Sequence, residues 1–167
     1  LGALALVTLA GGPGLIPPGA TTDTLVDFHE PGTYALLCFI ENADGVPHVA
    51  LGMVDALEVT GEPTAPAELA ADVEVRMFDF AYTMPDVVPA GRTLWKVVND
   101  GPQPHEMIVL RLADGADFDG LMTHLRENGE HGMPAVPVGG AQGLGDGLTS
   151  YLEWELEPGA YVAICFI

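Results

Sequence analysis

Residues 31–53 read PGTYALLCFIENADGVPHVALGM, and the rest of the chain is interpreted outward from them. The stretch begins with a Pro31-Gly32 turn and continues into the uncharged apolar run Tyr34–Ile40, which has the length of a strand. We predict a strand buried on both faces there. A loop rich in Asn, Asp, Gly and Pro follows, and a second strand is predicted over 53–59.

Three types of metal-binding side chain occur in order in this stretch. Cys38 lies within the apolar run, His48 follows ten residues later, and Met53 five residues after that. A second imidazole is available at His105, in the segment NDGPQPHEM. A thiolate, two imidazoles and a weak axial thioether form the ligand set of a blue-copper electron-transfer site. We therefore predict copper ligands at Cys38, His48, Met53 and His105.

An internal repeat places a second cysteine in the same context. Residues 23–40, DTLVDFHEPGTYALLCFI, align at an offset of 127 with residues 150–167, SYLEWELEPGAYVAICFI, and 8 of the 18 positions are identical. The identical positions include the PG turn, the tyrosine after it, and Cys38 with Cys165. A period of this length indicates a repeated domain rather than a solenoid. Cys165 is therefore a predicted ligand of the second copy, the alternative being a spare thiol in this chain.

The repeat explains why the ligands stand in an unusual order. The first copy has Cys, His and Met but no early His, and the second has His105 and Cys165 but nothing after them. We predict that 1–60 is the C-terminal part of a first domain, 61–72 a linker, and 73–167 the N-terminal part of a second. The two parts could also pack together as one sandwich. Because the two cysteines hold equivalent places, the alternative of a single disulfide between them is not expected.

Periodicity predicts the remaining elements. One helix is expected over 117–128, where Asp117 can cap and the apolar residues Phe118, Leu121, Met122 and Leu125 share a face. Residues 129–147, rich in Gly and Pro, are interpreted as a long loop. Further strands are predicted at 24–30, 73–80, 93–99, 105–112, 150–157 and 161–167.

With these residues in place, the sequence resembles the cupredoxins, the plastocyanin/azurin family. The shared pattern is an early His after an Asn-x-Gly turn, a late PGxYxxxC strand, and a loop with His and then Met. Here Asn99-Asp100-Gly101 precedes His105, and Pro158-Gly159 precedes Tyr161 and Cys165. The resemblance implies an all-β fold, a Greek-key antiparallel β-sandwich with type 1 copper at its loop end.

Two features depart from the family pattern. The gap of nine residues between Cys38 and His48 is longer than in small plastocyanins and closer to the ligand loop of copper nitrite reductases. Glu106 follows His105 where plastocyanins and azurins carry Asn, so the hydrogen bond to the cysteine sulfur is expected to differ.

Composition limits the partners. The chain has 24 acidic and 5 basic residues, a net charge of −19, which argues against nucleic acid and anionic membranes. It fits a protein that meets basic partners or works in a salty environment. No apolar run could span a bilayer. The opening LGALALVTLAGG could pass as the end of a signal peptide, but we interpret it as a piece of domain with an upstream part missing.

We expect a periplasmic or extracellular electron carrier, rather than an enzyme, that works with a redox partner protein. One alternative is a fragment of a multi-domain copper oxidoreductase, which would need further His ligands; the chain has five His and no His-x-His pair. Another is a non-redox copper-binding β-sandwich module. His29, His124 and His131 match no part of the pattern and are expected to be surface residues.

Overall fold

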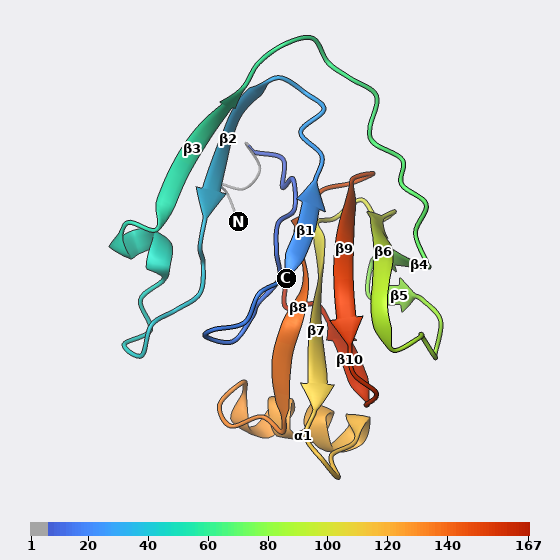
Figure 1. The fold of residues 1–167 in the computed structure, drawn as a ribbon. Coiled ribbons are helices and arrows are strands. Elements are labelled where there is room, and N and C mark those ends of the chain that lie inside the picture. The colour runs from blue at the N-terminus through green and yellow to red at the C-terminus, as the bar shows by residue number, and fades with distance from the viewer. Residues whose placement is uncertain (1–6) are drawn as a thin grey trace. The chain divides into compact units, whose positions relative to one another are not determined.

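The computed structural model describes residues 7–167 (Figure 1), and these residues are mostly strand. They form ten strands, one α-helix and a short 3-10 helix. The expectation of an all-β protein with one helix is therefore confirmed at this level. The chain divides into two compact units, a small one over Phe28–Glu68 and a large one made of the described residues up to Asp27 with Leu69–Ile167. No helix in residues 7–167 is both long enough and apolar enough to cross a membrane.

The large unit contains two sheets (Figure 1). The first has the order β1-β9-β6-β4-β5 and the second the order β10-β7-β8. Neighbouring strands are antiparallel except β4 and β6, which run parallel. The bounds in the first sheet are β1 Asp23–Val26, β9 Thr149–Leu156, β6 Gly91–Asn99, β4 Val73–Phe78 and β5 Ala81–Thr83. In the second they are β10 Tyr161–Ile164, β7 His105–Leu112 and β8 Ala135–Leu144.

One hydrophobic core joins the two sheets. The alternation predicted for β4 is confirmed, because Val73, Val75 and Met77 are buried while the residues between them are not. They cluster with the edge-to-face pair Trp95 and Trp154, and with buried side chains of β7 and β8 from the other sheet. The large unit is therefore a two-sheet sandwich.

Strand β7 is buried on both faces, because a helix covers the side that faces away from the first sheet. The helix α1, Phe118–Asn128, begins where predicted, and the Asp117 carboxylate accepts a hydrogen bond from the Gly120 amide over 2.8 Å. Its Leu121 is fully buried in a second core with Ile108 and Leu110 of β7. This arrangement holds β7, whose first residue is His105, between two cores.

The interpretation of 129–147 as a loop was wrong, because β8 occupies Ala135–Leu144. Its Pro and Gly residues suggested a loop, but Gly140 is needed for close packing against β7. A Cβ atom there would lie 1.9 Å from the Met107 carbonyl oxygen. The register between β7 and β8 also shifts between His105 and Met107, which marks a bulge.

Strand β1 pairs with its own repeat equivalent. Asp23 lies opposite Glu153 and Val26 opposite Ser150, whereas the offset of 127 relates Asp23 to Ser150 and Val26 to Glu153. The pairing is therefore symmetric about a local two-fold axis between equivalent strands. The predicted strand 24–30 is shorter than expected, because the paired part ends at Val26.

The small unit is a hairpin of β2, Gly32–Leu37, and β3, Val54–Val59. The prediction that Tyr34–Ile40 forms a strand buried on both faces was wrong. The strand stops at Leu37, and every residue of β2 except Tyr34 is exposed. The apolar pattern was read correctly as strand, but this hairpin has no second layer of its own over its apolar side chains.

Candidate metal centre

The loop between β2 and β3 folds back so that Cys38, His48 and Met53 meet at its base. The Cys38 amide donates to the Met53 carbonyl over 3.3 Å, and the Met53 amide donates to the His48 carbonyl over 2.9 Å. The Val49 amide donates to the Cys38 carbonyl over 2.8 Å. Further out, the Asn42 side-chain oxygen accepts from the amides of Asp44 and Val46 and closes the loop tip. The backbone therefore brings the three predicted ligand positions of the small unit together.

The thiol of Cys38 lies against the imidazole of His48. The distance between Cys38 Sγ and His48 Nδ1 is 3.5 Å, and both residues are half-buried. His48 opens a short 3-10 helix, His48–Leu51, that follows Pro47 and ends at Gly52 in the left-handed conformation. Cys38 and Cys165 are both free thiols.

Met53 is held at the same place by its backbone, but its side chain is not enclosed. The residue is 59% exposed. Its role as an axial ligand stays a prediction that rests on the order Cys, His, Met along the loop.

His105 lies in the large unit and is tied to a carboxylate. It is 8% exposed, and its Nε2 atom lies 3.0 Å from Asp79 Oδ1. The other carboxylate oxygen of Asp79 accepts a hydrogen bond from Gln103 Nε2 over 2.9 Å. The hydrogen bond from Gln103, and next the one with His105, lowers the pKa of Asp79 below its ordinary value. The imidazole is therefore oriented through one nitrogen, with Nδ1 left for another partner.

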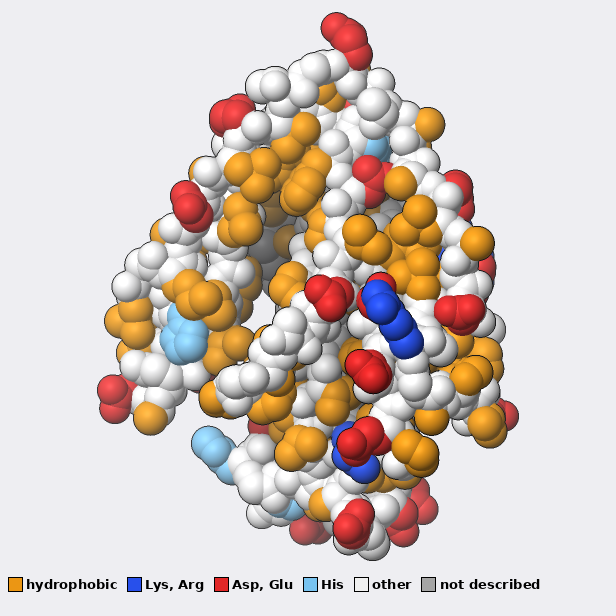
Figure 2. Space-filling model, viewed as in Figure 1, with side chains coloured by type: hydrophobic (Ala, Val, Ile, Leu, Met, Phe, Trp, Pro, Cys, Tyr) orange, Lys and Arg blue, Asp and Glu red, His pale blue; other side chains and the backbone are white. Residues whose placement is uncertain are grey.

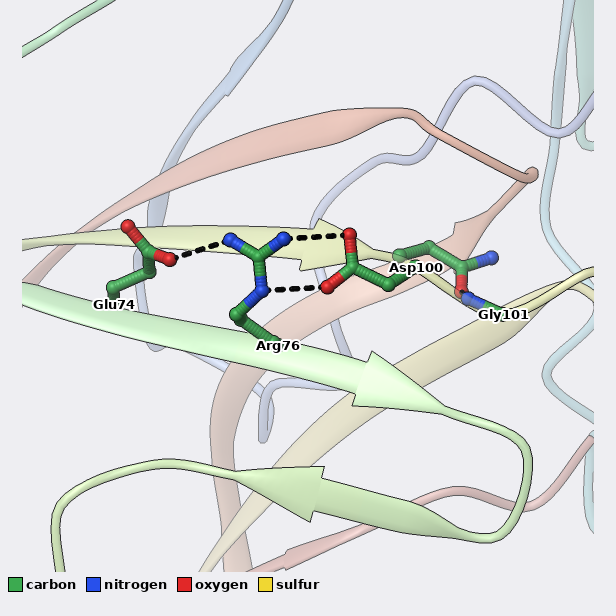
Figure 3. Close-up of polar contacts among 5 residues, drawn as sticks. Glu74, Arg76, Asp100 and Gly101 are labelled. Carbon is green, nitrogen blue, oxygen red and sulfur yellow. Dashed lines mark hydrogen bonds and ion pairs between the residues drawn. The ribbon is translucent and has the colours of Figure 1, made fainter.

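The turn before His105 is fixed by two polar anchors. The fully buried Asn99 donates through Nδ2 to the carbonyls of Gln103 and Leu144, and its Oδ1 accepts from the Gly101 amide. Arg76 of β4 holds Asp100 through a two-pronged ion pair of 2.6 and 2.9 Å, and its third nitrogen contacts Glu74 (Figure 3). Both anchors keep the approach to His105 rigid.

Cys165 directly follows β10 and lies close to a buried carboxyl group. The Phe166 amide donates to Glu106 Oε1 over 3.0 Å, and Gln142 Nε2 donates to Glu106 Oε2 over 2.5 Å. Burial raises the pKa of Glu106. The Tyr82 hydroxyl donates to the Glu106 carbonyl over 2.6 Å, and burial, followed by the nearby Cys165 and Glu106, raises the pKa of Tyr82.

The predicted ligands are divided between the two units. Cys38, His48 and Met53 share the small unit, while His105 and Cys165 belong to the large one. Within residues 7–167, no group of three or more His, Cys, Asp or Glu side chains is gathered closely enough to hold a metal ion. Sequence reasoning missed Asp79, although the alternation of the predicted strand 73–80 placed this carboxylate on the same face as Val75 and Met77, which are buried. An acidic residue in line with buried apolar residues needs a polar partner, and this was the signal in the sequence that Asp79 makes a specific contact.

Of the three histidines expected at the surface, His131 is exposed, while His29 and His124 are half-buried. His124 on α1 contacts the carbonyl oxygen of His131 through Nε2 over 2.8 Å.

No protein-family model, curated protein or solved structure matches this chain.

Proposed function

We propose that this chain binds copper in a type 1 site and carries single electrons to or from a redox partner protein. The ligands in this proposal are the Cys38 thiolate, the His48 and His105 imidazoles and, more weakly, the Met53 thioether. The observation that carries the proposal is the 3.5 Å distance between Cys38 Sγ and His48 Nδ1.

That distance fits two ligands of one ion. Metal–sulfur and metal–nitrogen bonds of about 2.3 and about 2.0 Å at a tetrahedral angle put the two donor atoms about 3.5 Å apart. A thiol–imidazole hydrogen bond has a similar length, so the metal must be tested directly. The donor set itself favours copper, because a soft thiolate suits Cu(I) and imidazole suits both oxidation states.

His105 has the surroundings of a metal-binding imidazole. Histidine ligands commonly donate their other ring nitrogen to a carboxylate, which fixes the tautomer and the ring orientation. The contact of Nε2 with Asp79 supplies such a partner and leaves Nδ1 as the candidate donor. Asp79 is in turn held by Gln103, so its orientation is also restricted.

The repeat supports a cupredoxin-like sandwich as the finer fold. The hydroxyl of Tyr34 donates to the Glu30 carbonyl and that of Tyr161 donates to the Glu157 carbonyl, each over 2.8 Å. The same local structure therefore precedes Cys38 and Cys165. This agreement supports our inference that the two cysteines directly follow equivalent strands of Greek-key sandwiches.

Copper in such a site would supply a reversible one-electron couple. The chain's part is to hold thiolate and imidazoles in nearly the same positions in both oxidation states, which a loop closed by backbone hydrogen bonds favours. Acidic side chains are spread over the visible face and basic ones are few (Figure 2). Because the net charge is −19, we infer a basic docking surface on the partner. A periplasmic or extracellular location is part of the same proposal.

The direct test is addition of one equivalent of Cu(II), followed by visible and EPR spectra. We expect an intense thiolate-to-copper band that is lost in Cys38→Ser and in His48→Ala and that disappears reversibly on reduction. Cys165→Ser is the matched control, because it removes the repeat-equivalent thiol, and its band should persist. A band lost only in Cys165→Ser would overturn the ligand assignment, and the absence of a band in the wild type would overturn the function.

A further inference from the structure

The hairpin β2–β3 presents apolar side chains that its own unit does not cover. A two-stranded hairpin alone is only marginally stable in water, and in the described residues the outer edge of β2 pairs with no strand. An exposed edge beside apolar side chains marks an association surface. The large apolar residues between 36 and 54 that are roughly half exposed or more are Leu36, Leu37, Phe39, Ile40, Leu51, Met53 and Val54.

The internal repeat shows what covers the equivalent strand. β10 is the repeat counterpart of β2, and it pairs with β7 so that Tyr161 lies opposite Arg111 and Ile164 opposite Ile108. Val162 is buried and Ile164 packs in the core under α1, while Ala163 packs in the core between the sheets. The counterpart of Ile164 is Leu37 and that of Ala163 is Leu36, so the exposed leucines occupy positions that are packed in β10.

We propose that the hairpin β2–β3 of one molecule replaces β10 on strand β7 of a second copy of this chain, reciprocally. β7 is the strand with which the counterpart of β2 already pairs. The incoming strand has six residues where β10 has four, so it can pair with β7 over a longer stretch, and Leu36 and Leu37 would take the packed positions that β10 occupies. The exchanged pair is closed and two-fold symmetric, which limits assembly to a dimer.

Equivalent segments of the two repeats already associate within this chain. β1 pairs with β9 about a local two-fold axis, through positions that the repeat makes equivalent.

The net charge of −19 on each copy opposes association, and salt screens that repulsion. The exchanged dimer should therefore form more completely at high salt.

The exchange would also complete the metal site, and this part rests on the proposed copper function. Continuing the β10–β7 register by one residue puts Cys165, and hence an exchanged Cys38, opposite Met107 and two residues from His105. Cys38, His48 and Met53 of one molecule would then meet His105 of the other.

The association is tested first without copper, by light scattering on the apoprotein of residues 1–167 at high salt. We expect twice the mass of one chain for the wild type and a monomer for Leu37→Glu. Val87→Glu is the control, because it adds the same charge at an exposed loop residue, and it should remain a dimer. A monomeric wild type, or a dimer that survives Leu37→Glu, would overturn the exchange whatever the outcome with copper.

The shared site is tested by complementation in a Cys165→Ser background. His105→Gln and Cys38→Ser chains should each lack the blue band alone, and refolding them together should restore it. The expected intensity is about a quarter of the parent's, since half of randomly formed pairs are mixed and each mixed pair holds one complete site. A blue parent with no restoration would overturn the exchange and leave the proposed function standing. A colourless parent would overturn the function, while the mass measurement would still decide the exchange.

Discussion

The imidazole Nε2 of His105 lies 3.0 Å from the Oδ1 oxygen of Asp79, and this contact joins the first residue of β7 to the residue after β4. It connects the two sheets of the large unit at the end where β7 begins. Gly101 packs against the contact, since a Cβ atom there would lie 2.7 Å from Asp79 Oδ1 and 3.0 Å from His105 Nε2. The turn before His105 and the carboxylate that orients it therefore form one unit.

Replacing Asp79 with Asn should alter the response of stability to acid. The pKa of Asp79 is lowered in the folded protein, so its contribution is present above the unfolded pKa near 3.8 and is lost as the pH falls through the folded value. Asp79→Asn should be less stable than the wild type at neutral pH, and the difference should shrink on acidification. Urea denaturation at a series of pH values measures this, with Asp114→Asn as a control at an exposed carboxylate. A difference that stays constant with pH would contradict the prediction.

Tyr82 should limit stability at alkaline pH. Its pKa is raised in the folded protein, so above the unfolded value of about 10 the unfolded state loses a proton that the folded state keeps, and stability falls as pH rises. Tyr82→Phe removes the hydrogen bond to the Glu106 carbonyl and should lower the free energy of unfolding by about 1 kcal/mol at neutral pH. As the pH rises, the free energy of unfolding should fall less in the variant than in the wild type. Tyrosinate absorbance should rise equally in both proteins until the wild type unfolds. An earlier excess in the wild type would show that Tyr82 ionises in the folded state.

Asn99→Ala should be strongly destabilising. The side chain is fully buried and satisfies two carbonyls and one amide in the turn before His105, and these groups would be left without partners. We expect a loss of about 3 kcal/mol in the free energy of unfolding. Asn128→Ala, at the exposed end of α1 with a single 3.4 Å hydrogen bond, should cost less than about 0.5 kcal/mol. Equal losses in guanidinium denaturation would count against the role assigned to Asn99.

Gly140→Ala should separate steric packing from backbone conformation. Gly140 and Gly147 both have positive φ, of 144° and 72°, but a Cβ at Gly140 would meet the Met107 carbonyl whereas Gly147 faces open space. Gly147→Ala should cost about 1 kcal/mol for its conformation, and Gly140→Ala about 1–3 kcal/mol more. Thermal and chemical denaturation of both variants measure the difference. Similar losses would mean that β7 and β8 can separate slightly without cost.

Much of the local structure followed from residue order. The helix at 117–128 was predicted from Asp117 and the spacing of its apolar residues, and the structure places it at Phe118–Asn128. The same pattern did not say which apolar residues would be covered, since Leu121 is fully buried while Phe118 is 56% exposed. Burial depends on which strand the helix meets, and this information lies outside the helix.

The candidate site also contains one contact that the sequence predicted and one that it did not. The spacing of Cys38 and His48 within one loop suggested that they meet, and the structure brings the two side chains to 3.5 Å. The pairing of His105 with Asp79 joins residues 26 positions apart, one on β7 and one directly after β4 of the other sheet, and sequence reasoning did not find it. A loop of about fifteen residues constrains its own ends, whereas contacts between sheets depend on how whole layers pack.

The sequence by itself determined the helix, most of the strands, the repeat, and the convergence of Cys38 with His48, because periodicity and short loops act between neighbouring residues. Only the tertiary structure decided that 135–144 is a strand, that the apolar run before Cys38 is exposed, and that Asp79 orients His105. These features depend on which strand edges and buried polar groups meet. These contacts are set by the packing of segments that are distant in the sequence. Gly140 is required because the β7 backbone comes close to it, and the Asp79 carboxylate is stabilised by its hydrogen-bond partners.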